Sequence, residues 1–418
     1  MNSVEVENEV NGTAAVANAA TTSGATTKPG LLSLLSHSYA VWALCALLCL
    51  DLICRIGWQS LDFDHYASPN RSMVWWVVDD YRRQKTQPDV VLMGSSLLMH
   101  VLHGGDAEYL KLPQNEVYHH KSLMLEDLLR KRTGVKVNSF AFAIAGTMAS
   151  DAYAICSTLF AQEKKPKAII YSIAPRDFID NTLASPASTD TFRMMSQLGG
   201  VKDVEWQARN GLWEKVEYVL EQASSLYKHR NYFVHLQHHY VKPILRLVGY
   251  KQTEEVHTPF ALRRLSLLEM SEDIGSNERI ALPGLAAHYT DNSDEYRRRY
   301  QPFKQKEFAT QCSYLEKMLS FCDQQGIEVV LVNMPLTADN IKLLTPGAYQ
   351  LYKQNVTALA KRYHSEFIDM QDTSQFDKSL YCDTAHMTGA GGVKFFKSLA
   401  DKLTDGSRLA IGKNSSWQ

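Results

Sequence analysis

Two short motifs, far apart in the chain, carry the residue types that serine-type acyl chemistry needs. Asp383 and His386 stand close together near the C-terminus, and Ser96 follows Gly94 and Ser95 much earlier in the sequence. A serine hydroxyl becomes nucleophilic when a histidine takes its proton and a carboxylate fixes the tautomer of that histidine. Together the motifs predict a triad in which Ser96 attacks, His386 is the general base and Asp383 orients it.

Each motif also has a simpler interpretation. Serine is a favoured helix N-cap, so Ser96 taken alone is better explained as the start of a helix. Asp383 alone is explained as a turn residue beside an exposed histidine. Gly146 ends an apolar stretch, where its N–H can donate to an oxyanion or its positive φ can serve a turn. The chemical interpretation depends on the motifs taken together.

The elements expected to position these residues alternate between short apolar runs and helical periodicity. Such alternation predicts an α/β fold with right-handed crossovers and a five-stranded parallel sheet. Ser96 follows the first run, at the edge where an open parallel sheet binds ligands. The runs predicted as strands are Asp89–Met93, Val137–Phe142, Ala168–Ile173, Glu328–Met334 and Glu366–Met370, and helical stretches include 122–131, 149–163 and 308–325.

The N-terminal part divides into a tail over 1–30, expected to be disordered, and an apolar segment over 31–57. A membrane-spanning helix, a cleaved signal peptide and a buried helix of an intracellular α/β protein are the three interpretations of this segment. The long tail carries Glu5, Glu7 and Glu9, which argues against a signal peptide. We therefore predict an uncleaved single-pass anchor, whose orientation the flanking Lys28 and Arg55 do not set.

The remaining chain, 73–410, is predicted to form one domain with a helical insertion at about 181–308. The insertion has no clear strand, shows helical patterns over 213–227 and 232–248, and ends in a polar section. The sequence leaves open whether it is a lid or a docking surface.

Composition limits the remaining functions. The formal net charge is -1, so no electrostatic argument favours nucleic acid as a partner. The seven cysteines are scattered without a disulfide or zinc pattern, and no metal or other cofactor is expected. Cys382 is interpreted as a small buried residue, and the histidines at 235, 238 and 239 lack the carboxylate of a metalloprotease helix. The stretch Tyr296–Tyr300 fits a sugar-binding surface or, more simply, a solvated helix face.

The ordered set of motifs resembles the SGNH (GDSL-like) hydrolase superfamily over about 90–403, apart from the insertion. The resemblance implies a flavodoxin-like α/β/α fold, with Ser96 as the nucleophile of the first motif. It also implies an oxyanion hole formed by the backbone N–H groups of Ser96 and Gly146. The last family motif, Asp-x-x-His, matches Asp383 and His386.

One position departs from the family pattern. After the third strand the family usually has Gly-x-Asn-Asp, whose Asn donates to the oxyanion, whereas this chain has Arg176 followed by Asp177. Arg176 is the remaining candidate for a positive contribution to the oxyanion hole, or it simply pairs with Asp177.

With the Gly-Ser-Ser form and an N-terminal anchor, the chain is similar to the envelope branch of the superfamily. This resemblance implies a serine esterase or O-acyltransferase on the extracytoplasmic side of a membrane. Its substrate would be an acylated cell-envelope glycan, glycolipid or small ester, and its partner a membrane-bound acyltransferase. The rival hypothesis is a catalytically inactive SGNH-like scaffold that binds a glycan or such a partner. A separation of Ser96 and His386 too large to close by a change of side-chain rotamer would favour the scaffold.

Overall fold

The computed structural model describes residues 38–57, 73–161, 165–230, 244, 247, 280–284, 289–405, 409 and 411. The chain divides into two compact units, Met1–Ser60 and Leu61–Gln418. The predicted tail, part of the apolar segment and most of the helical pattern over 232–248 lie outside the described residues.

The described part of the first unit is one helix, α2 (Tyr39–Gly57). Its 19 residues have a mean hydropathy of 2.0, and none of its side chains is buried. Asp51 and Arg55, one turn apart, form an ion pair at 3.6 Å near its C-terminal end. By length and composition this helix can span a membrane.

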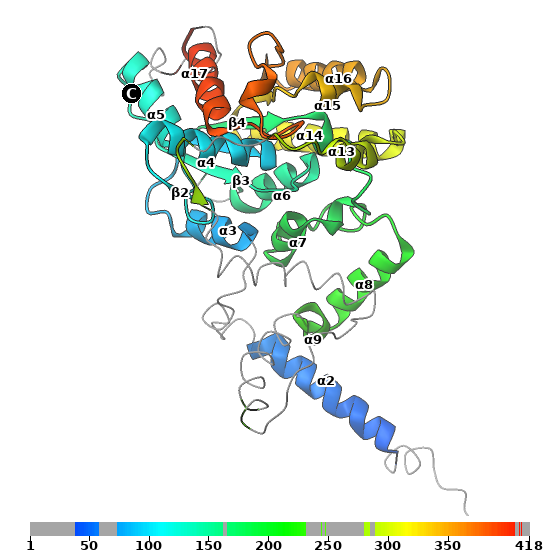
Figure 1. Cartoon of the computed structure of the whole chain (residues 1–418). Helices are drawn as coiled ribbons and strands as arrows, with labels where there is room; N and C mark the ends of the chain where they lie inside the picture. Colours follow the sequence, from blue (N-terminus) through cyan, green and yellow to red (C-terminus); the bar gives the residue numbers. More distant parts are fainter. Residues whose placement is uncertain are drawn as a thin grey trace, which may run out of the picture. The chain divides into compact units, whose positions relative to one another are not determined.

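The second unit is built on a parallel sheet of five strands, in the order β3-β1-β4-β6-β7 (Figure 1). Every residue of the first three strands of this sheet along the chain is buried, which explains their predominantly apolar sequences. Direct pairing sets the register: Val90 lies beside Ser139 on one side and beside Ala168 on the other. The strands are β1 (Val90–Gly94), β3 (Ser139–Ala143), β4 (Ala168–Ile173), β6 (Glu328–Asn333) and β7 (Glu366–Asp369).

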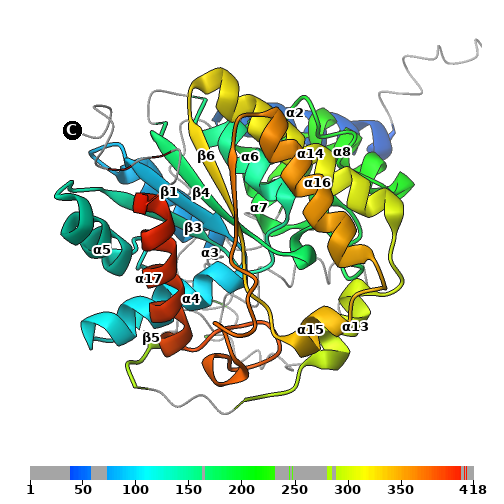
Figure 2. The ribbon, with the colours of Figure 1, turned by 90° about the horizontal axis from the view of Figure 1, so that it is seen from above.

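The larger helices form two groups by their contacts, and Figure 2 shows them in different parts of the unit. In the first, α4 (Ser96–Leu110) packs against α17 (Gly389–Asp405) and α5 (Leu123–Thr133). In the second, α6 (Ala149–Leu159) packs against α14 (Gln305–Gln325) and α7 (Asp190–Gln197), and α14 also contacts α16 (Ala348–Arg362). The other helices are α3 (Met73–Arg83), α8 (Leu212–Ala223), α9 (Ser225–Lys228), α13 (Ser293–Tyr300) and α15 (Ala338–Lys342), with 3-10 turns at Pro175–Asp177, Pro186–Ser188 and Lys378–Leu380.

The predicted strands and their order along the chain are confirmed, with ends that agree to within two residues. The expectation that the insertion lacks a strand is wrong, because β5 (Ile280–Ala281) pairs antiparallel with β2 (Gln114–Asn115). Two residues are too few to produce a periodic signal in the sequence. The helical pattern over 213–227 corresponds to two helices, since Ser224 ends α8 and caps α9 by accepting a hydrogen bond from the N–H of Tyr227.

Candidate active site

Ser96, His386 and Asp383 form one continuous hydrogen-bonded chain. The Ser96 hydroxyl lies 2.8 Å from Nε2 of His386, and Nδ1 of the same ring lies 2.7 Å from a carboxylate oxygen of Asp383. The carboxylate favours the tautomer with the proton on Nδ1, which leaves Nε2 free to accept the hydroxyl proton. The arrangement is therefore that of a nucleophile, a base and an orienting acid. The side chains of His386 and Asp383 are partly open to solvent.

The sharp turn from β1 into α4 presents Ser96 at the edge of the sheet. Ser95, buried and extended, occupies the N-cap position, and Ser96 is the first residue of the helix. The predicted capping role therefore belongs to Ser95, although its side chain makes no capping hydrogen bond. The Ser96 N–H is one of the first-turn donors that a helix cannot satisfy internally.

Close packing of α4 against α17 brings the C-terminal histidine to this serine. A Cβ atom added to Gly392 would lie 2.5 Å from the carbonyl oxygen of Val101 and 2.9 Å from the Cα atom of Gly105. Only glycine fits at this distance, so the two helix backbones are in direct contact. Because His386 lies just before α17 and Ser96 begins α4, this contact sets the separation of base and nucleophile.

A short tight loop holds His386 against Asp383. One carboxylate oxygen of Asp383 accepts the N–H groups of Ala385 and His386, both at 2.7 Å, while the other faces the ring. Burial raises the pKa of Asp383, but these hydrogen bonds outweigh burial and leave the pKa below its ordinary value. Asp383 is therefore ionised at neutral pH, as an orienting carboxylate must be.

Gly146 follows β3 and faces the same edge of the sheet. The loop is tied to the serine turn by a hydrogen bond of 3.0 Å from the N–H of Ile144 to the carbonyl oxygen of Gly94. Gly146 has a φ of 84°, a conformation that favours glycine, and it is half-buried. Its N–H donates no hydrogen bond to the described residues, so it remains available to an incoming group.

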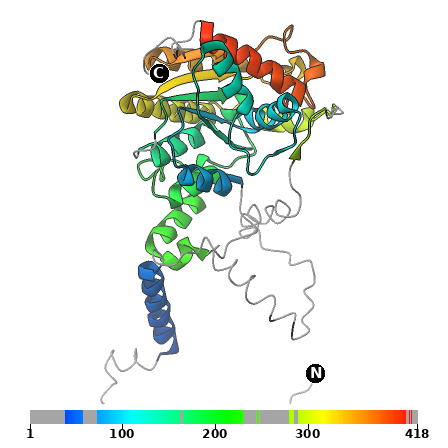
Figure 3. The ribbon, with the colours of Figure 1, turned by 90° about the vertical axis from the view of Figure 1, so that its left-hand side faces the viewer.

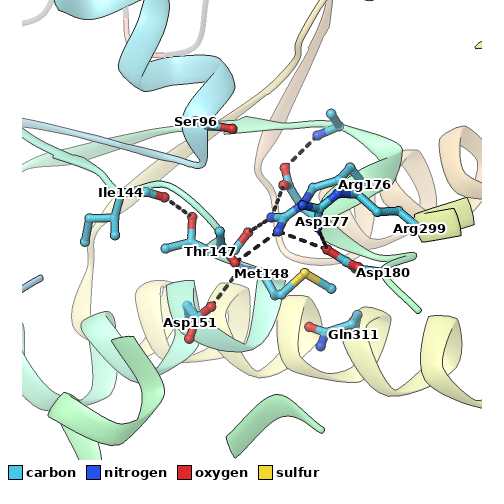
Figure 4. Close-up of polar contacts among 12 residues, drawn as sticks. Ser96, Ile144, Thr147, Met148, Asp151, Arg176, Asp177, Asp180, Arg299 and Gln311 are labelled. Carbon is cyan, nitrogen blue, oxygen red and sulfur yellow. Dashed lines mark hydrogen bonds and ion pairs between the residues drawn. The ribbon is translucent and has the colours of Figure 1, made fainter. Parts of the chain in front are cut away.

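Arg176 lies under this loop, with its guanidinium buried (Figure 4). It donates to the carbonyl oxygens of Thr147 at 2.7 Å and Gly146 at 3.3 Å. It also pairs with Asp180 at 3.0 Å and, more loosely, with Asp177 at 3.6 Å. The pairing of Arg176 with Asp177 is thus present. A contribution of Arg176 to an oxyanion hole stays a prediction, and its side chain contacts the carbonyl oxygens of the loop that carries Gly146. The contacts with the carbonyl oxygens of the loop were not foreseen.

Two further carboxylates near Arg176 are fully buried. Burial raises the pKa of Asp177 to about 6, against the opposing field of Arg176 and the N–H of Ala174. Burial likewise raises the pKa of Asp151 to about 7, although Thr189 and the N–H of Met148 donate to it. Asp151 accepts a hydrogen bond from the N–H of Met148, the residue after Thr147, and so holds the end of the loop that carries Gly146 (Figure 4).

Helix α13 contacts both the Asp383–His386 loop and Asp180, the carboxylate paired with Arg176, and no motif in the sequence predicts this. The Asn292 side chain, at its N-terminus, accepts hydrogen bonds from both the N–H and the hydroxyl of Thr384, a fully buried residue in the Asp383–His386 loop. At the other end, Arg299 binds Asp180 at 2.6 Å, the carboxylate that holds Arg176. One short helix therefore contacts both the loop that carries His386 and the carboxylate that pairs with Arg176.

The aromatic and basic stretch at Tyr296–Tyr300 belongs to this helix. Tyr296 and Tyr300 are buried, and the Tyr296 ring centroid lies 6.5 Å from that of His386. Arg297 is exposed and pairs with Asp294. The stretch is thus a packed helix with a solvated face, closer to the simpler of the two interpretations.

Other candidate residues are also placed. His100, one turn after Ser96, stacks on His386 with 4.5 Å between ring centroids, so it lines the site. Cys382 is half-buried, and burial raises its pKa to about 11, in line with an unreactive thiol. Across the described ranges, no three metal-binding side chains gather at one point. The histidines at 235, 238 and 239 lie outside those ranges.

Comparison with known proteins adds no relative: no protein-family model matches the chain, and no curated protein matches it.

Proposed function

We propose that this chain is a membrane-anchored serine esterase or O-acyltransferase of the SGNH type. The observation that carries the proposal is the unbroken contact from Ser96 through His386 to Asp383, with distances of 2.8 and 2.7 Å. General-base activation of a hydroxyl requires this geometry. The same contact favours an enzyme over the inactive scaffold, which a wide separation of the serine and the histidine would have supported.

The reaction follows from the hydrogen bonds. His386 Nε2 takes the hydroxyl proton as Ser96 Oγ attacks the acyl carbonyl carbon. The resulting oxyanion accepts hydrogen bonds from the N–H groups of Ser96 and Gly146. His386 then gives its proton to the departing alkoxide, which leaves an acyl group on Ser96. Water or a glycan hydroxyl repeats these steps in reverse, so hydrolysis and transfer differ only in the acceptor.

We infer that Arg176 serves the oxyanion hole by positioning the loop that carries Gly146. Its hydrogen bonds to the carbonyl oxygens of Gly146 and Thr147, with Asp180 behind it, restrain that loop from the side away from Ser96 (Figure 4). A restrained loop keeps the N–H of Gly146 in place as the negative charge develops.

The sheet supports the family proposed. Numbered along the chain within the sheet, its order is 2-1-3-4-5, the order of flavodoxin-like folds. We infer the three-layer arrangement of that fold, with α4, α5 and α17 on one face and α6, α14 and α16 on the other. Ser96 and Arg176 follow β1 and β4, the two strands between which the strand order reverses, and Gly146 follows β3, the neighbour of β1.

Location and substrate belong to the same proposal. The apolar helix α2 would anchor the chain as a single pass, with the α/β domain on the extracytoplasmic side. An acylated envelope glycan or glycolipid is the proposed substrate, and a membrane-bound acyltransferase the proposed partner.

Labelling with a fluorophosphonate probe tests the chemistry directly, because the probe reacts with activated serines. Wild type is expected to be labelled, whereas Ser96→Ala and His386→Ala are expected to show at most about one hundredth of that rate, consistent with loss of a triad member. Ser95→Ala is the matched control and should still be labelled. Labelling that persists in Ser96→Ala would exclude the proposed nucleophile.

A further inference from the structure

Helix α8 has its apolar and polar faces reversed relative to an ordinary surface helix. Leu212, Val219 and Leu220 lie on one face at helical spacing, with exposed fractions of 81%, 53% and 41%, and Trp213 beside them is 67% exposed. A surface helix normally turns such a stripe toward the protein. Here the stripe points away from it.

The polar face of α8 is the one that packs against the domain. Glu214 is buried and accepts hydrogen bonds from the Ser185 hydroxyl at 2.9 Å and from the N–H of Asn210 at 3.0 Å. One and two turns further along, Tyr218 lies under the Arg209 guanidinium and Glu221 pairs with Arg230. These contacts fix the rotation of the helix, so the exposure of the apolar stripe is a property of the fold.

The stripe lies on the side of the domain that carries α3, the N-terminal helix among the described residues of this unit. α3, the first described helix after α2, packs against α7, and α8 follows α7 along the chain. Figures 1 and 3 show these three helices on the same side of the sheet. Between Gly57 and Met73 the chain can extend at most about 55 Å, so an anchored α2 keeps this domain close to the bilayer.

We propose that the apolar face of α8 lies in the membrane interface, as a second contact of the domain with the lipid surface. The proposal rests on the membrane anchor proposed above. Leucine and valine beside an exposed tryptophan match the apolar face of interfacial helices, in which the indole lies at the level of the lipid headgroups. Lys215 lies over the exposed ring of Trp206 at 5.1 Å, which places a cation beside the same surface.

Site-specific photo-crosslinking in the full chain tests this contact. p-Benzoylphenylalanine is introduced at position 212 or 220, and the protein is reconstituted into vesicles of phosphatidylglycerol and phosphatidylcholine. Leu112, 60% exposed and two residues beyond the end of α4, is the matched control position. Lipid adducts, measured by mass spectrometry, are expected to be at least tenfold more abundant at 212 and 220 than at 112.

Several outcomes would overturn the proposal. Equal lipid yields at 112, 212 and 220 would do so, as would adducts at 212 and 220 with another part of the chain or with a second copy. Release of the protein from the vesicles by alkaline carbonate would contradict both the membrane anchor and the proposed contact of α8 with lipid. Fluorophosphonate labelling of the same samples separates a failure of this inference from a failure of the proposed chemistry.

Discussion

Replacing Arg176 by lysine tests whether its hydrogen bonds position the loop that carries Gly146, the proposed oxyanion donor. Lysine keeps the positive charge beside Asp180 but provides a single ammonium group in place of the planar guanidinium. That group cannot hold Asp180 and also reach both carbonyl oxygens, of Thr147 and Gly146, which Arg176 binds at 2.7 and 3.3 Å. At least one charged hydrogen bond is lost, which is worth about 1.5–3 kcal/mol.

The expected result is slower labelling in a folded protein. If the lost hydrogen-bond energy raises the activation barrier by the same amount, the second-order rate constant for fluorophosphonate labelling falls by about ten- to one-hundredfold. A change of about 1.4 kcal/mol in the barrier is a factor of ten in rate. Arg176→Met removes the charge as well and leaves buried carboxylates uncompensated, which costs about 3–5 kcal/mol of stability. Thermal unfolding of both variants separates these two effects.

Asp180→Asn distinguishes positioning from direct donation. If Arg176 acts through the loop, loss of the Asp180 charge loosens the guanidinium, and labelling slows. If Arg176 itself donates to the oxyanion, neutralising its partner leaves the guanidinium freer and more strongly positive, so labelling stays the same or becomes faster. An unchanged or faster rate in Asp180→Asn, or a wild-type rate in Arg176→Lys, would refute the positioning role.

Three further predictions concern the surroundings of the triad. Asn292→Ala leaves the buried N–H and hydroxyl of Thr384 without their acceptor; we expect a loss of about 1–3 kcal/mol in stability by denaturant unfolding and about tenfold slower probe labelling. Asp151 has a folded pKa near 7, above its unfolded value, so its contribution to stability is present at low pH and is lost as the pH rises toward 7. The unfolding free energy of Asp151→Asn relative to wild type should therefore rise by about 4 kcal/mol from pH 4 to pH 8, and a flat difference would contradict the shift. Gly392→Ala forces α17 away from Val101, so we expect a lower melting temperature with at least tenfold slower labelling, and full activity at unchanged stability would contradict the packing argument.

Local patterns in the sequence were enough to predict the strands of the main sheet and the candidate triad. Buried parallel strands have mostly apolar sequences, and both Ser96 and His386 lie next to glycine-containing turns. The capping residue, Ser95, was missed by one position because adjacent serines have the same capping preference.

The supporting residues were not predictable in the same way. Asn292 binds Thr384 and Arg299 binds Asp180 across long stretches of sequence, and neither residue belongs to a motif. Arg176 was identified as a departure from a family pattern, but its hydrogen bonds to two backbone carbonyl oxygens depend on the path of the loop. Such contacts follow from the three-dimensional arrangement of the elements and have no periodic signature.

The close contact of α4 with α17 has a consequence for biosynthesis. Ser96 precedes His386 by 290 residues along the chain, so the proposed nucleophile would stay inert until α17 docks. Domains fold during and after synthesis, and contacts between distant segments form late. A nascent or truncated chain without α17 would therefore carry an unactivated serine and would not cleave acyl groups before folding is complete. Reactivity toward a serine probe would then report on completed folding as well as on chemistry.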